Sequence, residues 1–441
     1  MSKSSYSFSI TPEDMQIEQL GVPRIDSPIA PHVGGNVLDD SERVLYDDVI
    51  NGVETIDTAA QVSMERAGPR GHIYFDPSKV RAGIVTCGGL CPGLNAVIRA
   101  VVMGLWHVYG VRHIVGFRYG YEGFIAHHGH DILDLNPDVV DGWQDQGGTK
   151  LGSSRGEQDT VEIVDCLERL GISQLYTVGG DGTLRGARVI AEEIAKRGLR
   201  IAVIGIPKTI DNDIPFIDES FGFQTAVSAA VQSLACAHVE SKGVNNGVGL
   251  VKLMGRHSGF IACYAALAMS DVNFVLIPEV PFTLEGEDGF LRSLKRRLET
   301  RKHAVVVIAE GAGQDLLPKT DARDASGNVK LQDVGVYLRD QMVAFFKREK
   351  FDGTVKYIDP SYIVRSVAPN SHDNIYCLQL GHDAVHAAMA GKTAMLVGRW
   401  HGLNVHIPIQ SIAIGRKRVD PERPLWRSVL ESTGQNKWAK A

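Results

Sequence analysis

The sequence lacks several features that would each indicate a particular class of protein. No run of 18 apolar residues occurs, so we expect no membrane-spanning helix. No tract of lysines or arginines occurs, and the net charge of −6 argues against non-specific binding of nucleic acid. Six scattered cysteines in 441 residues do not suit a disulfide scaffold and favour a reducing, cytoplasmic location. The first residues, MSKSSYSFSITPEDM, also lack the apolar core of a secretory signal.

What is present is an ordinary globular composition, with 44% hydrophobic and 22% charged residues, in a chain long enough for two or more domains. Residues 1–78 differ from the rest, because they are rich in proline, serine and aspartate and show weak periodicity. We interpret them as an N-terminal extension that packs on the surface or on another subunit. The alternative is a disordered tail.

From Arg81 the chain repeats a strand, a glycine-rich turn and a helix. RAGIVT (81–86) leads through CGGLCPGLN into a helical pattern that ends near Gly110. ISQLYTV (172–178) leads through GGDGT into a second helix, for which Gly198 is the expected cap, and LRIAVIGI (199–206) follows. Two strands joined by a helix within about 35 residues pair in parallel through a right-handed crossover. The sequence therefore predicts an α/β protein with mostly parallel sheets.

The unusual motifs all stand directly after predicted strands. VGLVKL (248–253) runs into MGRHSGF, and HAVVVIA (303–309) runs into EGAG. Ligands of open α/β sheets bind at the carboxyl ends of the strands, so we expect these loops to converge on one crevice.

The GGDGT segment (179–183) has the composition of a phosphate-binding turn. Glycine lets the backbone approach a phosphate closely, and the N-terminus of the next helix favours negative charge. Asp181 would repel bare phosphate, but it suits a Mg²⁺ ion that bridges phosphate oxygens, and the Thr183 hydroxyl could donate to the same phosphate. CGGLCPG (87–93) is a second such turn, and two of them in one sheet suit a polyphosphate.

The segment IPKTIDNDI (206–214) places two carboxylates and an ammonium at the end of a buried strand. If the segment is extended, alternation puts Asp211 and Asp213 on the same side. One carboxylate could then take a proton from an attacking hydroxyl, while Lys208 adds positive charge where a phosphoryl group would pass. The alternative interpretation is an Asx-turn.

Further basic and acidic residues follow other predicted strands or lie in small-residue loops. Arginine matches the geometry of phosphate, and one acid among several bases suits a sugar phosphate. These residues are Arg155, Arg256, Glu310, Lys356, Tyr362 and Arg365. We interpret HHGH (127–130), which also looks like a metal-binding pattern, as a solvated loop.

Taken in order, the motifs GGLCPGLN, GGTKLGSSR, GGDGT, PKTIDNDI, MGRHSGF and AEGAG and the Arg365 segment resemble the phosphofructokinase family over about residues 81–415. The chain looks closest to the long-chain ATP-dependent enzymes of plants and trypanosomatids. It departs from the short bacterial enzymes, which have histidine at the position of Tyr362, arginine at that of Lys356, and an arginine donated by a neighbouring subunit at that of Gly247.

The resemblance implies transfer of the ATP γ-phosphoryl group to the 1-hydroxyl of fructose 6-phosphate with Mg²⁺, by a cytoplasmic, glycolytic and allosteric enzyme. The implied fold is two Rossmann-like three-layer α/β domains after the extension. The larger would be 79–222 with 365–415 on the nucleotide side, and the smaller 223–364 with the tail 416–441 on the sugar-phosphate side. The implied assembly is a homotetramer or homodimer, with no membrane or nucleic-acid partner.

The resemblance also assigns roles to individual residues. Asp211 would be the general base, Thr209 and Lys208 would face the transferred phosphoryl group, Arg155 would contact phosphate, and Asp181 would hold Mg²⁺. The residues expected to hold the sugar phosphate are Asp213, Met254, Gly255, Arg256, Glu310, Lys356, Tyr362 and Arg365. Those expected around the nucleotide are Gly88, Gly89, Tyr121, Gly180, Gly182, Thr183 and Gly186.

Three alternatives remain at this point. Pyrophosphate could be the donor, since Lys208 is typical of pyrophosphate users whereas Gly182 is typical of ATP users; the long ATP-dependent group combines both, which favours ATP. A lipid or NAD kinase shares GGDGT but has no place for PKTIDND. A non-catalytic regulatory subunit would be expected to have lost Asp181 or Asp211, and both are present.

Overall fold

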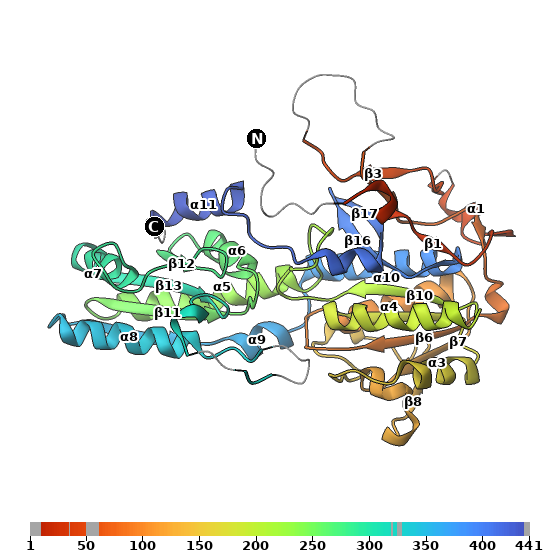
Figure 1. The fold of residues 1–441 in the computed structure, drawn as a ribbon, viewed down its shortest axis with the longest axis horizontal. Coiled ribbons are helices and arrows are strands. Elements are labelled where there is room, and N and C mark those ends of the chain that lie inside the picture. Colours follow the sequence, from red (N-terminus) through yellow and green to blue (C-terminus); the bar gives the residue numbers. More distant parts are fainter. Residues whose placement is uncertain (1–9, 35, 50–60, 319–320, 324–328, 436–441) are drawn as a thin grey trace. The chain divides into compact units, whose positions relative to one another are not determined.

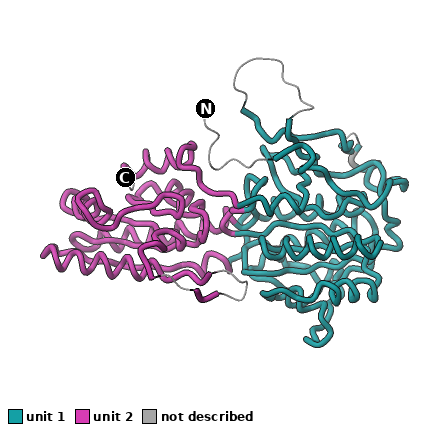
Figure 2. The backbone as a smooth tube through the Cα atoms, in the orientation of Figure 1, with its two compact units in different colours: residues 1–209, 214–222, 367–415 teal, residues 210–213, 223–366, 416–441 magenta. Residues whose placement is uncertain are grey.

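The computed structural model divides the chain into two compact units (Figures 1 and 2). Unit 1 comprises Met1–Thr209, Ile214–Gly222 and Val367–Gly415, and unit 2 comprises Ile210–Asp213, Phe223–Ser366 and Arg416–Ala441. The structure describes residues 10–34, 36–49, 61–318, 321–323 and 329–435. Parts of the expected extension (1–9, 35 and 50–60) and of the expected tail (436–441) lie outside the described residues.

A nine-stranded sheet with the order β3-β4-β17-β16-β10-β9-β6-β7-β8 forms the centre of unit 1. Its five consecutive strands from β16 to β7 are parallel, as the strand–helix–strand pattern predicts, and the antiparallel strands stand at the two edges. The strand bounds are β3 Arg43–Leu45, β4 Ser63–Arg66, β6 Arg81–Thr86, β7 His113–Phe117, β8 Ile132–Asp134, β9 Gln174–Gly179, β10 Ala202–Pro207, β16 Met395–Trp400 and β17 Leu403–Pro408.

Helices cover both faces of this sheet, which gives three layers (Figure 1). Successive residues of β9 point to opposite faces. Leu175 packs in a core with buried residues of α3 (Thr160–Arg169) and α4 (Asp181–Lys196), whereas the Gln174 amide contacts Met389 Sδ of α10 at 3.1 Å. The remaining helices of unit 1 are α1 Ala30–Val33, α2 Leu94–Met103 and α10 Ser371–Met389, with short turns η1 Pro12–Met15, η3 Pro77–Lys79, η4 Gly104–Val108, η5 Gly120–Phe124, η6 Ala126–His128, η7 Trp143–Asp145 and η9 Ile409–Ile414.

The described part of the first 78 residues contributes strands to unit 1. Strands β3 and β4 extend the large sheet through the pairing of β4 with β17. Two short ladders add to this: β1 (Glu18–Gln19) pairs with β15 (Lys392–Thr393), and β2 (Ile25–Asp26) pairs with β5 (His72–Ile73).

A cluster of buried charges fastens β4 to the rest of unit 1. The Glu65 carboxylate, only 8% exposed, accepts from Arg70 Nη2 at 2.7 Å, pairs with Lys392 Nζ at 2.7 Å and contacts His406 Nδ1 at 2.9 Å. Burial alone would raise the pKa of Glu65, but the hydrogen bond and charge of His406 and the Lys392 ammonium outweigh it and hold that pKa well below its usual range. Because the partners come from residue 70 and from residues beyond 390, the cluster joins distant parts of the sequence.

We expect Glu65→Gln to lower the free energy of unfolding by about 3–5 kcal/mol, because it removes the buried counter-ion of Arg70 and Lys392 and leaves these cations only the largely exposed Asp40 as an acidic partner. Chemical denaturation would measure the loss, with Glu42→Gln as the control, since the Glu42–Arg66 pair is about 40% exposed and worth little. A depressed carboxyl pKa stabilises the fold above the unfolded-state value of about 4.3, so this contribution should fade as the pH falls below it. Equal losses in the two variants would contradict the structural role of Glu65.

Unit 2 contains a four-stranded, fully parallel sheet with the order β12-β13-β11-β14. The bounds are β11 Gly247–Leu253, β12 Phe274–Leu276, β13 His303–Ala309 and β14 Thr354–Ile358. Its helices are α5 Phe223–Lys242, α6 Phe260–Ala268, α7 Phe290–Arg301, α8 Val334–Arg348, α9 Ser361–Ser366 and α11 Pro424–Thr433, with the turn η8 Gln314–Leu316.

The two faces of this sheet are also covered. Val248 and Leu250 pack in a core with buried residues of α7 and α8. Between them, Gly249 faces α5, where an added Cβ would lie 2.5 Å from the carbonyl oxygen of Ala237. The glycine therefore allows α5 to pack closely on β11, and unit 2 is a second three-layer α/β structure.

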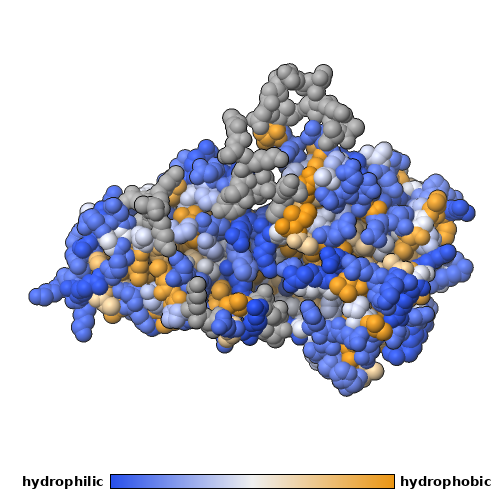
Figure 3. Space-filling model, in the orientation of Figure 1, coloured by the Kyte–Doolittle hydropathy of each residue, from blue (hydrophilic) through white to orange (hydrophobic). Residues whose placement is uncertain are grey.

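Hydrophilic residues dominate the surface visible in Figure 3, and apolar residues lie there in small separate patches. None of the helices in the described ranges combines the length and apolarity that a membrane crossing requires.

Candidate active site

Three neighbouring parallel strands of unit 1 carry the predicted phosphate-binding turns at one edge of the sheet. The order β10-β9-β6 and the pairings Pro207–Gly179 and Thr86–Val178 bring the carboxyl ends of these strands to the same level. The turn after β6, the GGDGT turn after β9 and Lys208 after β10 therefore lie together. The predicted convergence is confirmed for these three loops.

Lys208 connects the turns. Its backbone N–H donates to the Gly179 carbonyl at 2.9 Å, and its Nζ donates to the Gly89 carbonyl at 2.7 Å. A Cβ on Gly88 would lie 3.5 Å from that Nζ, and one on Gly89 would lie 3.5 Å from Arg155 Nη2. Lys208 as a residue is only 7% exposed and its Nζ lies beside Gly88 and Gly89, so the positive charge is held close to open backbone where an anion could approach.

Asp181 begins α4, as expected for a residue at a phosphate-binding helix N-terminus. Its Oδ2 pairs with Arg185 Nη1 at 2.6 Å, and the carboxylate remains 28% exposed. Arg185 was not predicted from the sequence, although its place four residues after Asp181 on a helix is a recognisable signal for such a pair.

The other predicted nucleotide residues divide into open and packed positions. A Cβ on Gly182 would meet nothing nearer than Arg185 Nη2 at 3.8 Å, so this position has space in front of it. A Cβ on Gly186 would lie 2.7 Å from the Tyr121 ring, and the Tyr121 hydroxyl donates to the Thr183 carbonyl at 2.8 Å. Tyr121 therefore supports the first turns of α4, and Gly182 is the exposed backbone beside them. Gly180 caps that helix.

The segment that carries Asp211 and Asp213 is not extended, which corrects the alternation argument. Residues 210 and 211 form a turn, and Asn212 has φ = 55°. The two carboxylates consequently have different partners: Asp211 Oδ2 accepts from the Arg256 backbone N–H at 3.3 Å, whereas Asp213 Oδ2 pairs with Arg416 Nη1 at 2.8 Å.

The basic residues around this turn were not predicted from the sequence. Lys417 Nζ donates to the Asn212 side chain at 2.9 Å, and the Lys417 N–H donates to the Asp213 carbonyl at 2.9 Å. Burial and the neighbouring Arg416 lower the pKa of His257 to about 4, so this imidazole is neutral near pH 7. Arg416 and Lys417 stand more than 200 residues from Asp213, and no local pattern links them to it.

A second group of predicted residues lies after β11 and β13, which are parallel neighbours with Leu253 paired to Ala309. The loops after these strands touch, because the Gly311 N–H donates to the Gly255 carbonyl at 3.1 Å. Gly255 has φ = 125°, and a Cβ on Gly311 would lie 2.0 Å from the Arg256 carbonyl oxygen, so both positions require glycine. The close approach sets Met254 and Arg256 next to Glu310.

Glu310 is half-buried among charges of both signs. Burial raises its pKa, while Arg256 and Lys252 act in the opposite direction. Lys252, also missed from the sequence, pairs with Asp359 at 2.8 Å and Asp333 at 3.2 Å. Arg256 Nη2 donates to the Val329 carbonyl.

Within unit 2, Lys356 lies apart from the loops after β11 and β13 that carry Arg256 and Glu310. It lies exposed on β14, paired with Gly249 four residues before the end of β11. Arg365 lies over the Tyr362 ring at 4.6 Å on α9, and Tyr362 is 76% exposed. At Gly247, a Cβ would lie 2.1 Å from the Ser241 carbonyl oxygen, so this backbone has no space for the arginine of the short bacterial enzymes.

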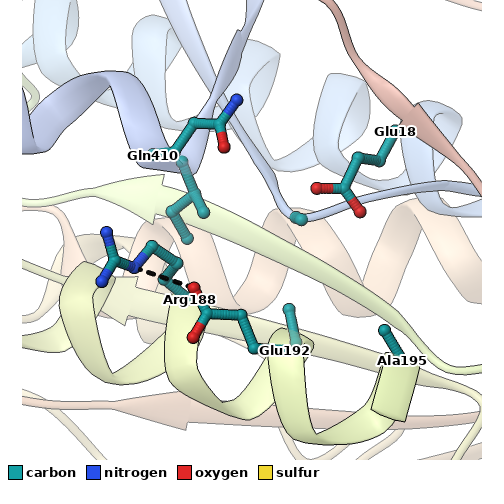
Figure 4. Close-up of a pocket in the computed structure, with 8 residues that line it drawn as sticks. Glu18, Arg188, Glu192, Ala195 and Gln410 are labelled. Atoms are coloured by element: carbon teal, nitrogen blue, oxygen red, sulfur yellow. Dashed lines mark ion pairs between the residues drawn. The ribbon is translucent and has the colours of Figure 1, made fainter.

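A separate cavity of about 260 Å³ in unit 1 lies away from the predicted turns (Figure 4). Its walls come from the second half of α4, with the Arg188–Glu192 ion pair, and from Glu18, Ala394, Ile409 and Gln410. Asp181 and Gly182 begin the same helix at its other end, so this cavity is not the predicted nucleotide site.

The chain is similar to known proteins in sequence and in fold. The model of the phosphofructokinase family matches residues 81–388, and the chain belongs to that family. An ATP-dependent 6-phosphofructokinase of Borreliella burgdorferi is 49% identical over 435 residues, covering 96% of this chain and 97% of that protein. ATP-dependent 6-phosphofructokinase 7 of Arabidopsis thaliana is 51% identical over 85% of this chain and 77% of its own. The ATP-dependent 6-phosphofructokinase of Trypanosoma cruzi is 43% identical over 96% and 88%.

Solved structures share the fold at lower identity. A pyrophosphate-dependent phosphofructokinase of Marinobacter aquaeolei has a TM-score of 0.66 at 21% identity, covering 81% of this chain and 92% of that one. Phosphofructokinase of Pichia pastoris has a TM-score of 0.63 at 23% identity, over 76% of this chain and 36% of that one. These likenesses support the α/β fold with two Rossmann-like domains.

Proposed function

We propose that this chain is an ATP-dependent 6-phosphofructokinase, which transfers the γ-phosphoryl group of ATP to the 1-hydroxyl of fructose 6-phosphate and yields fructose 1,6-bisphosphate. The observation that carries the proposal is the group of glycine-rich turns after β6 and β9 that Lys208 joins through Gly89 and Gly179. The relatives that are named for this activity and match nearly the whole chain support it.

The residues of unit 1 would bind the donor. The open backbone at Gly88, Gly89 and Gly182 would approach the phosphates, and the N-terminus of α4 would favour their charge. Arg155 and Lys208 would stabilise the negative charge of the transferred group. Thr209, the last residue of this part of unit 1, would contact the same group.

The residues of unit 2 would bind and activate the sugar. Asp211 would take the proton of the 1-hydroxyl, and Asp213 would hold a neighbouring hydroxyl. Arg256 and Arg365 would bind the 6-phosphate, and Glu310 would accept from sugar hydroxyls. We propose that both sets serve one reaction, because Lys208 and Thr209 stand directly before Ile210, at which unit 2 begins.

Asp181 is the residue that would hold Mg²⁺. The site fits, because Mg²⁺ is typically bound through one or two carboxylates plus substrate phosphates, and Asp181 presents a partly exposed carboxylate in the first turn of α4. Bound there, the ion would neutralise phosphate charge. Arg185, which shares the same carboxylate, would keep Asp181 oriented along the helix.

The activity is tested with a coupled assay of purified protein with fructose 6-phosphate and either Mg·ATP or pyrophosphate. We expect a much larger kcat/KM with ATP. Activity with pyrophosphate alone would show that the phosphoryl donor is pyrophosphate, while fructose 6-phosphate would remain the acceptor. No activity with either donor would contradict the proposal and favour a regulatory subunit.

Replacing Arg256 or Arg365 by alanine should raise KM for fructose 6-phosphate by about 10–100-fold, since each removes a charge-assisted hydrogen bond to phosphate. The KM for ATP should change far less. Arg301→Ala, at the exposed end of α7, is the matched control and should leave both constants unchanged. A rise in the KM for ATP as large as the rise in the KM for fructose 6-phosphate would show that these arginines do not bind the 6-phosphate specifically.

We also propose a cytoplasmic homo-oligomer, a tetramer or a dimer. Lys356 is exposed and apart from the Arg256 loop within unit 2, which suits a contact that a second subunit receives. Exposed apolar side chains on α9 and α10, such as Ile363 at 62% and Ile375 at 59%, offer surface to bury. All six cysteines are free thiols, as a reducing compartment favours.

The oligomer is tested by light scattering at the assay concentration. An active monomer under these conditions would contradict the proposed oligomer.

A further inference from the structure

The segment from η5 to the residues just after η6 in unit 1 brings two histidines and a glutamate together. Glu122 lies within η5, His128 ends η6, and His130 follows two residues later, after Gly129. One ligand atom from each of the three side chains lies within 4.8 Å of the other two. The glycine between the histidines has φ = 66°, and this left-handed residue reverses the chain so that the two imidazoles stack with centroids 5.7 Å apart.

The pair His130–Glu122 already has the spacing of two ligands of one ion. His130 Nε2 lies 3.5 Å from Glu122 Oε2. Two atoms that each stand about 2.1 Å from a tetrahedral zinc ion are about 3.4 Å apart. His130 Nε2 is also buried and makes no hydrogen bond, although its ring is packed at 4.6 Å from the Tyr119 ring. A buried ring nitrogen aimed at a carboxylate is costly unless a proton or a cation lies between them.

We propose that Glu122, His128 and His130 form a binding site for a divalent transition-metal ion, with zinc as the best-fitting metal. Two imidazole nitrogens and one carboxylate form a set of ligands that suits zinc better than magnesium or calcium. His128 is exposed, so its ring can move the short remaining distance. The site is separate from Asp181, where oxygen donors alone suit Mg²⁺.

The expected consequence is a more rigid turn. The Ala126 N–H already donates to Glu162 of α3 at 3.1 Å, which anchors one side of the turn. An ion held by Glu122 and the two histidines would anchor the other side to η5. Because binding favours the folded state, zinc should raise the melting temperature.

The test is zinc titration of the full chain by calorimetry, with bound zinc measured by elemental analysis after gel filtration. Exposed Cys236 can also take up zinc, so all proteins carry Cys236→Ser. The background protein should bind one zinc ion per chain. His130→Ala and His128→Ala should weaken binding at least about 100-fold, since even outer partners of a metal ligand are worth 10–100-fold.

His127→Ala is the matched control, because His127 is also exposed, stands next to His128 and is not one of the three clustered residues. It should retain the affinity and the zinc-dependent rise in melting temperature that the other two variants lose. Two outcomes would overturn the proposal: equal zinc binding by the background protein and His130→Ala, or equal loss in His127→Ala and His128→Ala. His128 is on the surface, so its variant should fold even if the half-buried His130 proves necessary for stability.

Discussion

Asp211→Asn should lower kcat by about 10²–10⁴-fold with little change in KM for fructose 6-phosphate, because a positioned general base typically contributes this much. The structure gives a reason for the position. The Arg256 N–H donates to Asp211 Oδ2 at 3.3 Å, and the Ser258 hydroxyl donates to the Asp211 carbonyl at 2.8 Å. The carboxylate is therefore held by the loop proposed to bind the sugar phosphate. Asparagine keeps the shape and can still accept from Arg256, but it cannot take the proton.

Asp213→Asn is the comparison that separates chemistry from binding. Asp213 pairs with Arg416 at 2.8 Å, and its proposed role is to hold a sugar hydroxyl. We expect this variant to raise KM for the sugar more than it lowers kcat. The assignment of the base would be wrong if Asp211→Asn or Asp211→Ser kept more than about a tenth of the kcat, or if Asp213→Asn showed the larger loss of kcat.

Gly182→Asp should remove most activity with ATP. We expect a fall in kcat/KM of at least about tenfold and up to about 10³-fold, because two unit charges about 4 Å apart at an effective dielectric of 20 repel by about 4 kcal/mol. The fold should tolerate the change. Gly182 has helical backbone, its Cβ would meet nothing nearer than Arg185 Nη2 at 3.8 Å, and an acid in the first turn of a helix is favourable.

Gly182→Asn is the matched control, since asparagine fills the same space without the charge. A loss confined to the aspartate variant would indicate repulsion of the donor phosphates, and equal losses would indicate that volume alone matters. Measurement of kcat/KM with ATP and with pyrophosphate for all three proteins distinguishes these cases. A fast Gly182→Asp enzyme with ATP would show that the nucleotide phosphates do not pass this position.

Local signals in the sequence were sufficient for the strands and turns that carry the candidate site. The apolar runs at 81–86 and 303–309 coincide with β6 and β13; a glycine-rich turn follows β6 as predicted, whereas after β9 only Gly180 separates the strand from α4. Apolar runs and glycines are informative because burial and backbone freedom are properties of consecutive residues. The ordered motifs were also sufficient for the family.

The same local reasoning was wrong about the geometry of the Asp211 segment. It assumed an extended chain, in which two acids at alternate positions share a face. The left-handed Asn212 instead directs Asp211 to the loop after β11 and Asp213 to Arg416. Asparagine tolerates this conformation better than most residues, but nothing in the segment requires it.

Only the tertiary structure decided the contacts between residues that are far apart in the sequence. The pairing of Asp213 with Arg416, of Lys252 with Asp359 and of Glu65 with Lys392 each joins segments more than 100 residues apart. The physical reason is that a charge pair leaves no periodic trace in the sequence, whereas a strand or a helix does. The sequence by itself therefore determined the apolar strands and glycine-rich connections of the candidate site and the family, and the fold decided which charges meet.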